Sequence, residues 1–62
     1  MTGLNLMPNI ADADDFYADL LAAHEGLSTE ESTALNARLV LILANHIGAR
    51  DVFAEALKAA GK

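Results

Sequence analysis

The sequence of 62 residues contains no cysteine, and it is also poor in basic residues. The lack of cysteine excludes disulfide bonds and any zinc site built on thiolates. Four Lys and Arg residues stand against nine Asp and Glu, the net charge is -5, and the first basic residue is Arg38. Clustered basic residues are needed to bind a phosphate backbone or an anionic membrane surface. We therefore expect neither a nucleic-acid partner nor a membrane partner.

Long apolar runs are absent too. The longest strongly apolar stretch, residues 39–44, is far shorter than the roughly 20 residues that span a bilayer. The first eight residues lack the basic region and the apolar run of a secretory signal. These features predict a soluble protein of the cytoplasm.

The residues that are abundant favour helices. Alanine occurs 13 times, whereas there are only two valines, three isoleucines and one proline, so we predict an all-α domain. The hydrophobic fraction of 53% is slightly above the ordinary globular range. A chain of this size buries only about 60% of its unfolded surface, which makes its own core marginal. Without disulfides or a thiolate metal site, oligomerisation is the leading remaining source of stability.

We divide the chain into an extended N-terminal arm, residues 1–10, and a three-helix domain, residues 11–62. The first helix is predicted to start at Asp12, which suits the N-cap position. Gly26 should end this helix, with Leu27 folding back onto the last turn as in a Schellman cap.

The second helix carries the best local signal in the sequence, a capping box formed by Ser28 and Glu31. It is predicted to run to Ile47 and to stop at Gly48. The third helix should be capped by Asp51 and extend to residue 60, with an apolar face on one side. That face comprises Val52, Phe53, Ala56, Leu57 and Ala60. Because the connections are short, we expect successive helices to pack as antiparallel neighbours.

The second helix is unusual because it is apolar nearly all round, as buried helices are. One broad arc includes Leu35, Leu39 and Ile42, and two short flanking helices cannot cover the rest. We predict a helical bundle completed by oligomerisation, as a dimer or tetramer, or by a larger protein partner. The predicted interface residues are Ala34, Ala37, Leu41, Ala44 and Asn36. Asn36 would fix the register as a buried amide.

Few residues suggest chemistry. His24 and His46 lie on apolar arcs, and with Asn45 they could form a ligand or metal site at a helix interface. The simpler interpretation is that both imidazoles are partly buried and structural, since no HxxxH or ExxH spacing accompanies them. Ser32 and Thr33 lie early in a helix with no base at helical spacing. We expect no enzymatic activity, no bound metal and no cofactor.

A family resemblance rests on several strings. They are Pro8–Asp12, Asp15–Tyr17, Ala23–Ser28, Leu35–Leu39 and Leu43–Gly48, the last two within the pattern LNARLxLxLANHIG. These strings resemble the DUF2783 family of short uncharacterised bacterial proteins. The resemblance covers roughly residues 8–60 and implies a bacterial source and no established activity. It supplies no catalytic residues. The sequence as a whole predicts a small helical interaction module, either a homo-oligomer or an accessory subunit, and the alternative is a small-ligand or metal-binding protein using His24 and His46.

Overall fold

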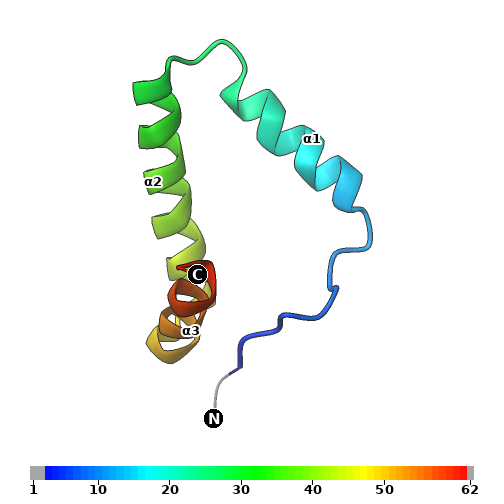
Figure 1. Ribbon diagram of the computed structural model, residues 1–62, viewed down its shortest axis with the longest axis vertical. Coiled ribbons are helices and arrows are strands. Elements are labelled where there is room, and N and C mark those ends of the chain that lie inside the picture. Colours follow the sequence, from blue (N-terminus) through cyan, green and yellow to red (C-terminus); the bar gives the residue numbers. More distant parts are fainter. Residues whose placement is uncertain (1–2, 62) are drawn as a thin grey trace.

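The computed structural model describes residues 3–61, which form three α-helices and no strand (Figure 1). Helix α1 spans Ala13–His24, α2 spans Thr29–Ile47, and α3 spans Arg50–Ala60. The predicted all-helical class with three helices is confirmed. Residues 3–10 contain neither helix nor strand and lead from the side of α3 to the start of α1 (Figure 1).

Helix α1 begins without the predicted side-chain cap. Asp12 occupies the N-cap position, but its carboxylate makes no capping hydrogen bond. Its backbone carbonyl instead accepts from the N–H groups of Asp15 (3.0 Å) and Phe16 (3.2 Å). The two acids of the first turn, Asp14 and Asp15, suit the positive end of the helix dipole.

The connection from α1 to α2 is a tight turn rather than the predicted Schellman cap. Glu25 has φ -60° and ψ 130°, and Gly26 follows with φ 79°. The N–H of Leu27 donates to the carbonyl of His24 at 3.1 Å. This pattern is a type II turn, which needs a positive φ at its third residue and therefore favours glycine there. Gly26 thus ends α1 as expected but redirects the chain by a different hydrogen bond.

Helix α2 begins with the predicted capping box. The Glu31 N–H donates to Ser28 Oγ at 3.1 Å, and the Ser28 N–H donates to Glu31 Oε1 at 2.9 Å. At the other end Gly48 adopts a left-handed φ of 73°, and its N–H donates to the carbonyl of Ala44 at 2.9 Å. Both predicted boundaries of this helix are confirmed.

Helix α3 begins at Arg50, two residues earlier than a cap at Asp51 would allow. Ala49 is the N-cap residue and makes no side-chain capping bond, so the prediction of Asp51 as the cap is wrong. Only Ala49 separates the left-handed Gly48 from the first residue of α3, Arg50. The connection between α2 and α3 is therefore very short. Asp51 lies in the first turn of α3, where its negative charge interacts favourably with the positive end of the helix dipole.

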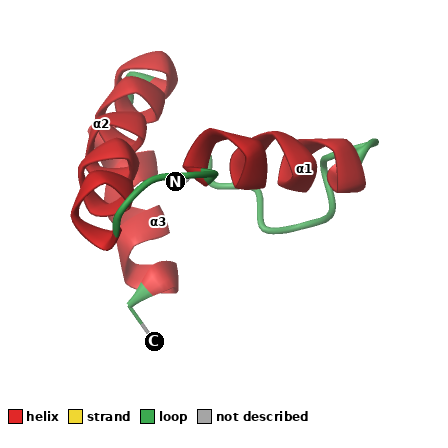
Figure 2. Cartoon of the chain, turned by 90° about the horizontal axis from the view of Figure 1, so that it is seen from above, coloured by secondary structure: helices red, strands yellow, loops and turns green. Residues whose placement is uncertain are grey.

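Only α2 and α3 pack closely. Helix α3 crosses the C-terminal end of α2, and its half-buried residues are Val52, Phe53, Ala56 and Ala59 (Figures 1 and 2). The predicted face is thus shifted, because Ala59 replaces Ala60 and Leu57 remains 56% exposed. The start of the arm lies near α3, since a Cβ added at Gly3 would be 3.5 Å from Val52 Cγ2.

Helix α1 stands away from α2 instead of packing along it, and both views show the two helices diverging from their connection (Figures 1 and 2). The expectation of antiparallel neighbours therefore fails for this pair. Among residues 3–61 no side chain is fully buried. In that same range, none of the helices combines the length and apolar character required to cross a membrane.

Candidate interaction surface

Exposed apolar side chains are concentrated in the C-terminal half of α2. Leu41 is 69% exposed and Ile42 is 64% exposed, although both are large aliphatic side chains. We call this region the α2 apolar surface, and it comprises Val40, Leu41, Ile42, Leu43 and Ile47. Four consecutive helical residues point to all sides of the axis, so these side chains encircle this part of α2 and do not form a single face. Exposed apolar residues of this kind make the α2 apolar surface a candidate interaction site.

The five predicted interface residues differ in their exposure. Leu41, Ala34, Ala37 and Asn36 are exposed in a single chain. Ala44 is half-buried. Asn36 gains no burial within one chain, so its predicted role in fixing register requires a second polypeptide.

Helix α1 presents a second apolar surface of similar character. Phe16, Tyr17, Leu20 and Leu21 are all exposed, Tyr17 to 62%. Their spacing places them on one side of the helix, as in any amphipathic helix that docks against a core. We call these four residues the α1 apolar surface. In the single chain no element covers it, because α1 diverges from α2 and α3 (Figures 1 and 2).

His24 makes one side-chain contact that sequence reasoning missed. Its Nδ1 atom lies 3.0 Å from Ser32 Oγ, and both residues are half-buried. The hydrogen bond joins the end of α1 to the first turns of α2. Helical spacing relates residues within one helix only, whereas the turn at Gly26 brings these two residues together from two helices.

The other predicted ligand residues lie elsewhere. His46 and Asn45 are near the C-terminal end of α2, and both are exposed. Fourteen residues of helix separate Ser32 from His46, which corresponds to about 21 Å. One chain therefore does not bring His24 and His46 together. Within residues 3–61 no three His, Cys, Asp or Glu side chains are grouped as a metal site would need.

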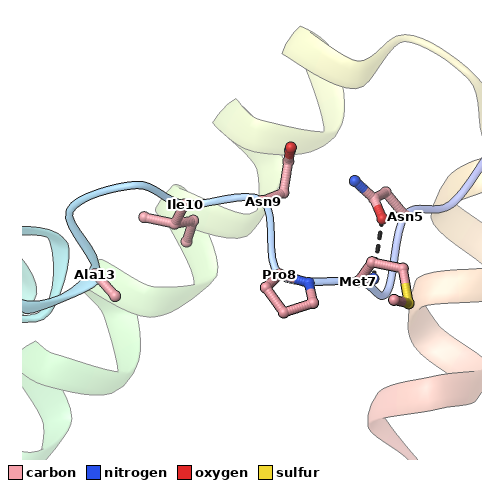
Figure 3. A pocket seen from close by; sticks show the side chains of 6 residues that line it. All are labelled: Asn5, Met7, Pro8, Asn9, Ile10 and Ala13. Atoms are coloured by element: carbon pink, nitrogen blue, oxygen red, sulfur yellow. Dashed lines mark hydrogen bonds between the residues drawn. The ribbon is translucent and has the colours of Figure 1, made fainter.

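The N-terminal arm and the first residue of α1 line an open pocket of about 480 Å³ (Figure 3). Its lining consists of Asn5, Met7, Pro8, Asn9, Ile10 and Ala13. Asn5 is committed to the arm itself, because its Oδ1 atom accepts from the Met7 N–H at 2.9 Å. The lining contains no titratable side chain, so the pocket offers shape and apolar contact but no acid–base chemistry.

Charges are left unpaired on the described surface. Arg38 is exposed on α2, and no ion pair forms among the side chains of residues 3–61. The acids of α1 and the arginine of α2 are therefore both free to meet groups of another polypeptide.

The family described as "Protein of unknown function (DUF2783)" matches residues 4–62, nearly the whole chain. The chain therefore belongs to this family, and the resemblance noted in the sequence is confirmed. Comparison with curated proteins and with solved structures gave no match.

Proposed function

We propose that this member of the DUF2783 family is a small cytoplasmic interaction module without catalytic activity of its own, working as a homo-oligomer or as an accessory subunit. The observation that carries the proposal is the exposure of Leu41, 69% exposed in a chain that has no buried side chain among residues 3–61. A chain that fully buries none of its large apolar side chains gains only part of the main favourable term in folding. Association supplies that term.

The energetic argument favours burial of both apolar surfaces. Burying one large aliphatic or aromatic side chain stabilises a protein by roughly 1.5–3 kcal/mol relative to leaving it exposed. The α1 and α2 apolar surfaces together contain nine such side chains. Even partial coverage of these residues is comparable with the whole stability of a small domain, which is about 5–15 kcal/mol. Folding and association are therefore coupled.

A charge placed on the α2 apolar surface tests this function. We expect Leu41→Glu to dissociate the assembly or to unfold the chain, because a carboxylate would have to be desolvated at the contact. Ala22→Glu is the matched control, since it adds the same charge at an exposed position on the outward side of α1. The control should leave the assembly intact.

Mass measured by light scattering after size exclusion, together with far-ultraviolet circular dichroism, reads out both variants and the unaltered chain. The proposal requires the unaltered chain to be larger than 6.5 kDa when helical, or to become helical only with a partner. A stable, fully helical monomer at micromolar concentration would contradict it. Thermal shifts with divalent cations, made on the same samples, address metal binding by His24 and His46.

A further inference from the structure

We propose that the polypeptide covering the apolar surfaces is a second copy of this chain, in a two-fold dimer whose copies interlock through their open α1–α2 angles. In this interlocked dimer, the α1 apolar surface of each copy packs on the α2 apolar surface of the other. The inference rests on the proposed function and deepens it by naming the partner, the number of copies and the pairing of helices.

The exposed area of the chain is the first reason. One copy exposes 5510 Å², whereas a compact folded monomer of 6.5 kDa exposes about 3,800 Å². A compact body of two copies exposes about 6,300 Å². Pairing two open chains into such a body would bury about 4,700 Å² in total, which lies within the range of obligate dimers, about 2,000–5,000 Å² and above. Two copies therefore suffice to bury the excess.

The dimensions of the chain are the second reason. Its radius of gyration is 13.4 Å, but a compact domain of 62 residues has a radius of about 10.6 Å. A compact body of two copies has an expected radius of about 13.7 Å. One open chain is thus already as extended as a compact dimer. When two interlocked chains share one centre, the radius of gyration of the dimer equals that of one chain. When two compact chains lie side by side, the radius of the dimer exceeds that of each chain.

The α1–α2 connection explains why α1 does not close on its own α2. Three local interactions act on residues 24–32: the type II turn at Gly26, the capping box of Ser28 and Glu31, and the hydrogen bond between His24 and Ser32. The capping box fixes the first residue of α2, while the turn and the His24–Ser32 hydrogen bond connect the end of α1 to α2. Folding α1 back along its own α2 would require the turn and the His24–Ser32 bond to change. The opening is therefore available to another helix.

The distribution of charge suits a second copy as the occupant. Arg38 lies in the polar stripe of α2 and has no acidic partner in the described part of its own chain. Helical spacing places Asp14 at the edge of the α1 apolar surface, whereas Asp15 and Asp19 lie on the opposite side of the helix. An α1 helix docked on α2 of the partner copy would therefore bring Asp14, and not the outward acids, toward Arg38. The chain thus offers both charges of a self-complementary contact, as a two-fold interface requires.

Small-angle X-ray scattering on the unaltered full chain, with mass determined by light scattering, tests the proposal. We expect a mass twice the 6.5 kDa of one chain and a radius of gyration between about 13 and 15 Å. A dimer with a radius near 18 Å, as expected for chains 24 Å wide placed side by side, would overturn the interlocking and leave the proposed function standing. A tetramer would also overturn the interlocked dimer and leave the proposed function standing. A compact helical monomer near 10.6 Å would overturn both.

A distance within one chain tests the pairing of helices separately. Because the chain has no cysteine, Asp15→Cys and Asn45→Cys provide unique positions for two spin labels, both exposed. The doubly labelled chain is diluted with excess unlabelled chain, so that only the intrachain distance is measured. If α1 closed on its own α2, the two positions would be offset by about 10 Å along helices packed about 10 Å apart, which gives a backbone distance of about 15 Å. We expect a clearly longer distance, and one near 15 Å would overturn the interlocked dimer.

Discussion

His24 and Ser32 hold the end of α1 to the beginning of α2, with 3.0 Å between the imidazole Nδ1 atom and the hydroxyl Oγ atom. Eight residues separate them in sequence, and they belong to different helices. A serine hydroxyl both donates and accepts, so the direction of the hydrogen bond follows from the tautomer of the imidazole. The pair therefore serves as a structural link between the two helices.

A double-mutant cycle should measure this link. We expect His24→Ala and Ser32→Ala each to destabilise the protein, and the pair to be coupled by about 0.5–1.5 kcal/mol, as for a typical intramolecular hydrogen bond. Urea denaturation of the four proteins provides the free energies. Additive effects of the two substitutions would contradict the assignment.

Loss of the capping box should weaken α2. Replacing an N-cap serine by alanine typically costs about 0.5–2 kcal/mol, and Ser28 makes both reciprocal bonds of the box with Glu31. We therefore expect Ser28→Ala to lower the free energy of unfolding by about 1 kcal/mol. Thr29→Ala is the matched control, because it removes the neighbouring hydroxyl, for which no hydrogen bond is formed in the described chain. Equal losses in the two variants would argue against the cap.

How much the sequence predicted depended on whether the determinants were local. The Ser28 and Gly48 boundaries of α2 need only a few neighbouring residues, and both were predicted correctly. At Gly26 the glycine was identified, but glycine supports several turns, so the hydrogen-bonding pattern was wrong. The prediction of Asp51 as the N-cap of α3 was wrong, because capping preference alone does not take account of the short connection before the helix.

The direction of α1 was beyond the sequence argument for a different reason. Short connections between helices ordinarily produce packed neighbours, and we applied that rule to α1 and α2. The structure instead sets the angle through the turn and the His24–Ser32 bond, which is visible only once both helices are placed. Which residues cover the apolar surfaces depends on that angle. The sequence therefore allowed a prediction of the interface residues, but not of the residues that they contact.

Gly48 should resist substitution by residues that avoid left-handed conformations. Its φ of 73° costs a residue with a Cβ roughly 1–2 kcal/mol, although space for the added atom exists, with Asn45 O at 3.8 Å. We expect Gly48→Ala to destabilise the protein by about that amount, and Gly48→Asn by less, since asparagine tolerates this region. Thermal denaturation followed by circular dichroism compares the two variants. An alanine variant as stable as the asparagine variant would show that the turn relaxes.

The stability of the unaltered chain should depend on its concentration, because folding and association are coupled in the proposed assembly. For a dimer that unfolds to monomers, a tenfold increase in protein concentration raises the apparent stability by about 1.4 kcal/mol. Urea denaturation at two concentrations should therefore show a higher midpoint for the more concentrated sample, with the same dependence in the Ala22→Glu control. In Leu41→Glu the midpoint should be lower, or the transition absent, because the charged α2 apolar surface no longer associates. Superimposable curves for the unaltered chain, with a helical signal at both concentrations, would mean that the three helices are stable without a partner and that the exposed Leu41 and its neighbours are tolerated in water.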